Sequence, residues 1–257
     1  MALGICVLSS ISVLESPKFS SNRVYELLFA EAFSIIERQK SWALIQLPDS
    51  EIQGWIMEGQ FELVEEIIPA DYIIDEVGGY AVAGENKTMQ IHHGSPIPEN
   101  KSIITAVDNY KILSDLRDTE EGYEEERDRE QLENFVASYL NTPFSYKGRT
   151  VHGIDNIGLC GLFYRHFGLE IPKDIPGILQ LGTSIDFISE IRGGDLAFFI
   201  NEQGEGVPDA IVEIWSTDAD GAYDLQANDP STMDMRGQFR TAGFGLVDVH
   251  ALGEGAV

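Results

Sequence analysis

Short apolar runs separated by turn-forming residues fill the first part of the chain. The first four runs lie at residues 4–8, 33–36, 41–47 and 54–56. No helical period of 3.6 residues is sustained between them, and turn formers such as Ser16-Pro17 interrupt them, which is typical of short β-strands. We therefore predict a small β-barrel over residues 1–65.

The same pattern continues over residues 66–116. Its apolar runs lie at residues 72–74, 80–82, 89–92, 102–104 and 110–113, and a Gly-Ser-Pro turn signal stands at 94–96. Runs of this length, bounded by turn formers, predict strands rather than helices. We therefore predict a second small unit of short strands in this part of the chain.

Acidic residues dominate the next segment, where eight of the thirteen residues from Asp118 to Glu130 are Asp or Glu. A binding tail is one interpretation. We favour a solvated linker over residues 117–126 that leads into a helix, because acidic side chains suit the positive end of a helix dipole. The helix is predicted to begin near residue 127 and to end before Thr142-Pro143, since apolar residues recur at helical spacing: Leu132, Phe135, Val136, Tyr139 and Leu140.

A second helix is marked at both ends. Asp155 can cap its N-terminus, apolar residues recur at 159, 162, 163 and 167, and Gly168 followed by Pro172 ends it. Strand-like runs follow at residues 195–200, 210–215 and 223–227. We predict an α+β domain over residues 127–257, in which these runs are antiparallel strands.

The net charge excludes several classes of partner. The 257 residues carry 17 basic and 43 acidic side chains, so the formal net charge is −26. Such a surface repels phosphate backbones and anionic lipid, so we expect no nucleic-acid binding. We expect no membrane insertion either, because no apolar stretch approaches the ~18 residues that span a bilayer. The first residues lack the basic region of a secretory signal, so we expect a cytoplasmic protein.

Few side chains suit metal binding or covalent chemistry. The two cysteines, Cys6 and Cys160, can form neither a disulfide framework nor a Cys-rich zinc site. His92 and His93 are adjacent in the sequence. Because neighbours on a strand point to opposite faces, we interpret them as surface histidines rather than as a metal-binding pair. We expect no metal and no cofactor.

Four ordered motifs in the C-terminal half, at residues 141–149, 153–158, 171–174 and 194–199, resemble the NlpC-type papain-like cysteine peptidases of bacterial cell-wall turnover. In the N-terminal half, the order of residues 27–33, Trp42 and residues 54–56 is similar to a bacterial SH3-like domain, and residues 88–113 resemble a second one. The resemblance implies an α+β fold in which two small SH3-like β-barrels precede a papain-like domain.

The resemblance also implies a reaction and three catalytic positions. Members of this family cleave the γ-D-glutamyl bond to a diamino acid in peptidoglycan stem peptides, using a Cys thiolate at a helix N-terminus and two histidines. In this chain the three positions fall at Asn156, Asp209 and Gln226, with Pro208 and Asp224 as alternatives for the two histidines. An Asn amide cannot form the acyl intermediate. We therefore predict a non-catalytic member of the family that acts by ligand or protein binding or as an assembly subunit.

The family's substrate pocket is only partly kept. The resemblance places five residues there: Ile52, Phe144, Tyr146, Asp155 and Ile157. The family has hydroxyl groups at the positions of Phe144 and Ile157, and relatives often carry Tyr at the position of Ile52, so hydrogen-bonding groups for a stem peptide are missing. Asp155 is kept, but we favour a helix cap over a substrate contact.

The alternative prediction is an active peptidase or amidase that uses Cys160. This cysteine lies four residues beyond Asn156, about 6 Å further along the helix and on roughly the same face. It would need a base from His152 or His250, because no histidine lies between residues 167 and 249. We favour a buried packing role for Cys160. The partners we expect are a peptidoglycan-derived peptide, a protein, or further copies of the chain.

Overall fold

The computed structural model describes residues 2–48, 50–75, 77–84, 87–119, 131, 134–181, 183–185, 196–201 and 244–251. The chain divides into two compact units, Met1–Lys173 and Asp174–Val257, and each is described by itself. The first unit contains most of the described strands, and the second contains one described helix and three described strands.

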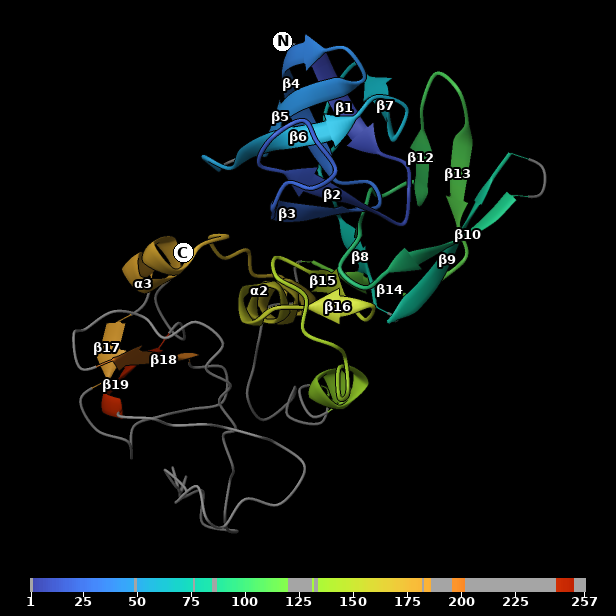
Figure 1. Ribbon diagram of the computed structural model, residues 1–257. Coiled ribbons are helices and arrows are strands. Elements are labelled where there is room, and N and C mark those ends of the chain that lie inside the picture. The colour runs from blue at the N-terminus through green and yellow to red at the C-terminus, as the bar shows by residue number, and fades with distance from the viewer. Residues whose placement is uncertain are drawn as a thin grey trace. The chain divides into compact units, whose positions relative to one another are not determined.

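A seven-stranded antiparallel sheet opens the first unit (Figure 1). The strands follow the order β3-β2-β6-β5-β4-β1-β7. Their bounds are β1 (Ala2–Cys6), β2 (Ser10–Leu14), β3 (Arg23–Leu28), β4 (Ala32–Gln39), β5 (Trp42–Gln46), β6 (Gln53–Met57) and β7 (Phe61–Val64). The runs predicted at residues 4–8, 33–36, 41–47 and 54–56 overlap β1, β4, β5 and β6, so their strand character is confirmed.

Alternating side chains of this sheet face one apolar core. In β5, Ala43 and Ile45 are buried while their neighbours are half-buried, as expected for a strand with one covered face. The core includes the fully buried Phe33, whose ring lies edge-on to Phe61 with 5.4 Å between centroids. Alternate residues of β5 are therefore buried on one face of the sheet.

The predicted barrel over residues 1–65 is not confirmed. β3 and β7 stand at the two ends of the sheet, and the pairings among the described residues do not join them. Apolar runs predict strands, but closing a barrel requires the two edge strands to pair. That pairing depends on strand order, which the runs alone do not specify.

Two smaller antiparallel sheets follow, with strand orders β10-β9-β13-β12 and β11-β8-β14. Their bounds are β8 (Tyr72–Ile74), β9 (Gly78–Ala83), β10 (Lys87–His92), β11 (Pro96–Ile97), β12 (Ser102–Ile104), β13 (Asn109–Ile112) and β14 (Leu116–Asp118). Ile5, Val7 and Phe29 are buried together with Ile74 and Ile91. Residues 1–65 therefore bury one core of their own and share a second core with residues 66–116.

β14 corrects the start of the predicted linker. It pairs with β8 through Asp118, so residues 117 and 118 belong to a strand. The acidic residues of this segment predicted a solvated linker. The strand forms because β14 pairs with β8, which lies far earlier in the chain. Residues 120–130 lie outside the described part of the chain.

The end of the first unit is built around a helix. Residues 134–138 are helical, as predicted for this part of the first helix. They are followed by β15 (Arg149–Thr150), β16 (Gly153–Ile154) and α2 (Asn156–His166). Leu162 of α2 is fully buried, in a cluster with Leu28, Phe135, Tyr139 and Ile154.

The second predicted helix is confirmed at both ends. Asp155 is the N-cap of α2 and Phe167 is its C-cap. Gly168 follows with φ of +76°, a left-handed conformation that glycine adopts at low cost because it has no Cβ. The amide of Leu169 then donates a hydrogen bond to the carbonyl of Tyr164 and closes the last turn.

In the second unit, α3 (Ile175–Leu181) precedes a three-stranded antiparallel sheet of order β17-β19-β18. The strands are β17 (Thr183–Ile185), β18 (Leu196–Asn201) and β19 (Phe244–Ala251). β18 confirms the strand predicted at residues 195–200, whereas the strands predicted at 210–215 and 223–227 lie outside the described residues. Among the described residues, no helix has the length and apolar character needed to cross a membrane.

Candidate functional site

Asn156 lies at the head of α2, where it is the first helical residue and is exposed. The preceding residue, Asp155, is buried, and both of its carboxylate oxygens are engaged by the backbone. Oδ1 accepts a hydrogen bond of 2.7 Å from the amide of Gly158, and Oδ2 accepts one of 2.8 Å from the amide of Lys147. The predicted capping role of Asp155 is therefore confirmed.

The head of α2 is fixed by close contact between backbones. A Cβ added to Gly158 would lie 2.1 Å from the carbonyl oxygen of Gly148, and one added to Gly148 would lie 2.3 Å from the carbonyl oxygen of Gly153. Only glycine fits at such separations, so the loop before α2 packs directly on the first turn of the helix. This packing fixes the first turn of α2 against the preceding loop.

Cys160 lies one turn further along α2. Burial and, to a smaller extent, the nearby negative charge of Asp155 raise the pKa of its thiol to about 12. A thiol with such a pKa is almost entirely protonated at neutral pH, whereas the nucleophile in cysteine chemistry is the thiolate. Within the described part of the chain, no histidine hydrogen-bonds to the sulfur of Cys160.

Alkylation kinetics test the state of Cys160. We expect iodoacetamide to label it at least about tenfold more slowly than an exposed thiol at pH 8. Burial limits the access of the reagent to the sulfur, and the raised pKa lowers the fraction of the thiol that is ionised. Cys160 is half-buried and Cys6 is buried. Because burial raises the pKa of both thiols, the native protein should label slowly at both cysteines. Unfolding in urea should make both fast. Fast labelling of Cys160 in the folded protein would contradict this assignment.

A buried ion-pair network lies beside α2. Glu31 accepts hydrogen bonds from Nη1 of Arg149 at 2.9 Å and from Nη1 of Arg165 at 2.8 Å. Arg149 also donates to the hydroxyl of Tyr25 and, at 3.1 Å, to the carbonyl of Glu26. Because Glu31 and Arg149 are each less than 9% exposed, these charges are satisfied by one another rather than by water.

The network shifts the pKa of its members. Burial by itself raises the pKa of Glu31, but the charges of Arg149 and Arg165 outweigh that effect and lower it to about 2. The same contacts, with Glu31 the largest favourable one, raise the pKa of Arg149 although burial lowers it. All three side chains are therefore charged at neutral pH.

A small pocket of about 30 Å³ lies against this network and the first turns of α2. The positively charged side chains that line it are Lys147, Arg149, Arg165 and Lys173, and its other lining residues include Tyr25, Asp155, Ile157 and Gly161. This volume holds about one or two water molecules. The pocket therefore cannot enclose a peptide.

The other predicted pocket residues are dispersed. Phe144 and Tyr146 are about 60% exposed, in the loop that precedes β15. Arg23 of β3 holds this loop by donating hydrogen bonds of 2.9 Å from Nε and 2.7 Å from Nη2 to the carbonyl of Tyr146. Ile52 packs against the core of the seven-stranded sheet. Asp209 and Gln226 lie outside the described residues.

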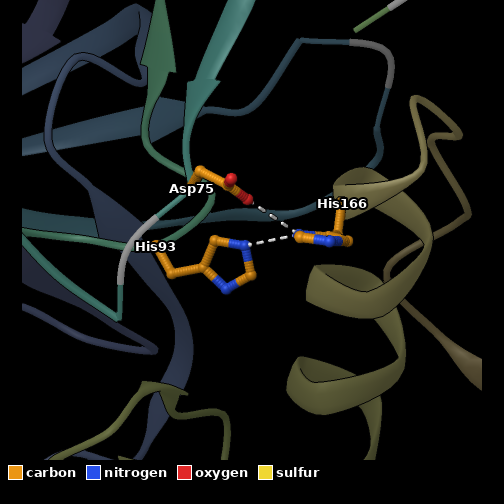
Figure 2. A group of neighbouring side chains, drawn as sticks. All are labelled: Asp75, His93 and His166. Carbon is orange, nitrogen blue, oxygen red and sulfur yellow. Dashed lines mark hydrogen bonds and ion pairs between the residues drawn. The ribbon is translucent and has the colours of Figure 1, made fainter. Parts of the chain in front are cut away.

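A cluster of Asp75, His93 and His166 elsewhere in the first unit was not predicted from the sequence. Figure 2 shows Asp75, His93 and His166 converging from the segment after β8, the turn after β10 and the end of α2. Nε2 of His93 lies 3.1 Å from Nδ1 of His166, which lies 3.5 Å from Oδ1 of Asp75. Burial, followed by the proximity of His166, lowers the pKa of His93 to about 3.

The interpretation of His92 and His93 as surface residues is wrong, because both side chains are buried. Their exposed fractions are 4% and 2%, and the ring of His92 packs against that of His152 with 5.2 Å between centroids. β10 ends at His92, so the rule that neighbours alternate between two faces of a strand does not extend to His93. The adjacent pair of histidines was the only local signal of a buried cluster in this segment.

Comparison with known proteins connects the chain to one group of peptidases. No protein-family model matches the sequence. The gamma-D-glutamyl-L-lysine dipeptidyl-peptidase of Bacillus cereus (strain ATCC 10987 / NRS 248) is 30% identical over 77 residues, which cover 30% of this chain and 23% of that protein. Dipeptidyl-peptidase 6 of Lysinibacillus sphaericus is 32% identical over 80 residues, which cover 31% of this chain and 30% of that protein. The matches thus span less than a third of either relative.

A solved structure extends the similarity to the fold. The crystal structure of an NlpC/P60 family protein from Bacillus cereus ATCC 10987 superposes with a TM-score of 0.63 at 14% identity, over 86% of this chain and 93% of that one. At this identity the match establishes the shared fold and not a shared activity. The chain is therefore similar in sequence to dipeptidyl-peptidases and in fold to an NlpC/P60 protein.

Proposed function

We propose that this protein is a non-catalytic relative of the NlpC/P60 γ-D-glutamyl peptidases and acts by binding. The observation that carries the proposal is the amide of Asn156 at the head of α2. A cysteine peptidase of papain type needs a thiolate at a helix N-terminus, where the dipole and a neighbouring histidine stabilise the charge. An uncharged amide at this position can accept and donate hydrogen bonds but cannot attack a carbonyl.

The state of Cys160 supports the same proposal. An active enzyme would need this thiol to ionise and reach a substrate, whereas its pKa lies near 12 and it is one turn beyond the helix head. The carboxylate of Asp155, which a substrate amine would require, already accepts hydrogen bonds from two backbone amides. Asp209 and Gln226 stand where the family has its two catalytic histidines, and this support for the proposal comes from the sequence alone.

The ligand that we propose is a peptide derived from peptidoglycan, bound over the exposed residues around the head of α2. Asn156, Phe144 and Tyr146 are all exposed there, and the lysines of the adjacent small pocket offer positive charge to a peptide carboxylate. Binding of a protein partner or self-association is the second form of the proposal. It is favoured by the size of the pocket, which cannot enclose a whole peptide.

Incubation with L-Ala-γ-D-Glu-diaminopimelate tests the proposal directly. We expect calorimetry to detect saturable binding and chromatography to detect no cleavage after prolonged incubation. Asn156→Ala, at an exposed position, should weaken peptide binding without unfolding the protein. Cleavage that disappears in Cys160→Ala would contradict the proposal and establish the alternative enzyme. Absence of both binding and cleavage, with a larger mass by light scattering, would assign the protein to assembly.

A further inference from the structure

Three donor atoms from distant parts of the first unit have the spacing of a metal site. All three, one each from Asp75, His93 and His166, lie within 4.8 Å of one another. Ligand atoms of a tetrahedral zinc site lie about 2.0–2.2 Å from the ion, which places them about 3.4 Å apart. The separations of 3.1 Å between the histidine nitrogens and 3.5 Å between His166 and Asp75 are close to this value. Two of the three separations between donor atoms are therefore close to those of a zinc site.

The donor set also suits a divalent transition metal. Two imidazole nitrogens and one carboxylate oxygen form a combination that binds Zn²⁺ through three protein ligands and leaves one position for water. The two histidine side chains are buried, whereas the side chain of Asp75 is 33% exposed. Asp75 is therefore the member of the cluster that solvent reaches most easily.

Neighbouring groups orient two of the three donors. Nδ1 of His93 lies 3.0 Å from the hydroxyl of Tyr139, and Nε of Arg117 donates a hydrogen bond of 3.0 Å to Oδ1 of Asp75. When Nδ1–H of His93 donates to Tyr139, the lone pair of Nε2 faces the cluster. Outer partners of this kind fix the tautomer and ring orientation of a histidine ligand in metal sites.

From this arrangement we propose that Asp75, His93 and His166 bind one Zn²⁺ ion. The ion joins the segment after β8, the turn after β10 and the last residue of α2, so its binding stabilises the packing of α2 in the first unit. This role is independent of the function proposed for the head of α2, which lies at the opposite end of the helix. If the zinc site proves wrong, the proposal of peptide binding at the head of α2 is unaffected, and the reverse also holds.

Titration of the metal-free full chain tests the site. Calorimetry with ZnCl₂ should give one ion per chain, CoCl₂ should produce the visible absorption bands of low-symmetry Co²⁺, and Zn²⁺ should raise the unfolding temperature. Asp75→Asn and His93→Ala should each weaken zinc binding at least about tenfold, and Tyr139→Phe should weaken it to a similar extent by releasing His93. Asp75→Asn removes the charge at a half-exposed position, so it tests the site even where a histidine variant fails to fold.

His152→Ala is the matched control. This histidine is exposed and its ring contacts His92, outside the cluster, so its loss should leave zinc binding unchanged. The proposal is overturned by the absence of saturable binding in the wild-type chain. It is also overturned if His152→Ala weakens binding as much as Asp75→Asn, because the ion would then bind at the other pair of histidines.

Discussion

Glu31→Ala is expected to lower the free energy of unfolding of the first unit by about 3–5 kcal/mol, because it leaves two buried guanidinium groups without their counter-charge. In the wild-type protein, Glu31 pairs with Arg149 and Arg165 at 2.9 and 2.8 Å and accepts a hydrogen bond of 3.0 Å from the amide of Leu28. Urea denaturation followed by circular dichroism measures the change.

A surface ion pair provides the control for this prediction. Glu58 lies 3.5 Å from Nε of Arg38, but the two side chains are 30% and 48% exposed. Water solvates both charges whether or not they are paired, so Glu58→Ala should change the unfolding free energy by less than about 1 kcal/mol. Similar effects of Glu31→Ala and Glu58→Ala would show that the buried network does not carry the stability assigned to it.

The same carboxylate gives a pH dependence with a definite sign. The pKa of Glu31 falls from 4.5 to about 2 on folding. A group whose pKa is lower in the folded state stabilises the protein above its unfolded pKa, and that contribution is lost as the pH falls through the folded pKa. The advantage of wild type over Glu31→Gln should therefore shrink by about 3 kcal/mol between pH 5 and pH 2. A constant difference over this range would contradict the assignment.

Gly158→Ala should destabilise the protein by about 1–3 kcal/mol, because the new methyl group overlaps backbone that cannot move independently. Its Cβ would lie 2.1 Å from the carbonyl oxygen of Gly148 and 3.1 Å from Oδ1 of Asp155. The head of α2 would have to move away from the preceding loop, so the N-cap hydrogen bonds of Asp155 should weaken as well. Denaturation in urea measures the loss, and amide exchange at Gly158 reports the weakened cap.

Gly161→Ala on the same helix should have the opposite sign. A Cβ added at Gly161 meets no atom within 4 Å. Alanine is favoured over glycine inside a helix by about 0.8–1.0 kcal/mol, so this variant should be slightly more stable than wild type. Destabilisation by both variants to the same extent would mean that helix propensity or the pocket, rather than contact with Gly148, decides the effect at residue 158.

Local signals predicted α2 well. Asp155 can cap a helix, the apolar residues that follow repeat at helical spacing, and Gly168 can adopt the left-handed conformation that ends it. Each of these depends on residues within one or two turns, so the chain specifies them without knowledge of the fold. β1, β4, β5 and β6 were predicted in the same way, because short apolar runs bounded by turn formers are also local signals, whereas β2, β3 and β7 were not predicted.

Features that join distant segments were not predictable from such signals. Glu31 is 118 residues from Arg149 and 134 from Arg165, and His93 is 73 residues from His166. A lone Glu or His in the sequence is compatible with an exposed or a buried position, and only the packing of other elements around it decides between them. The same reason explains why the second core, which residues 1–65 share with residues 66–116, was not anticipated.

The sequence by itself determined where α2 begins, that an amide stands at its head, and that strands dominate the first 116 residues, because these follow from periodicity and capping over short distances. The tertiary structure decided that Cys160 is held in its protonated form, that Glu31 is surrounded by guanidinium groups, and that Asp75, His93 and His166 meet. These depend on which side chains folding removes from water and brings within a few ångströms of one another, and that choice is made by packing between distant segments.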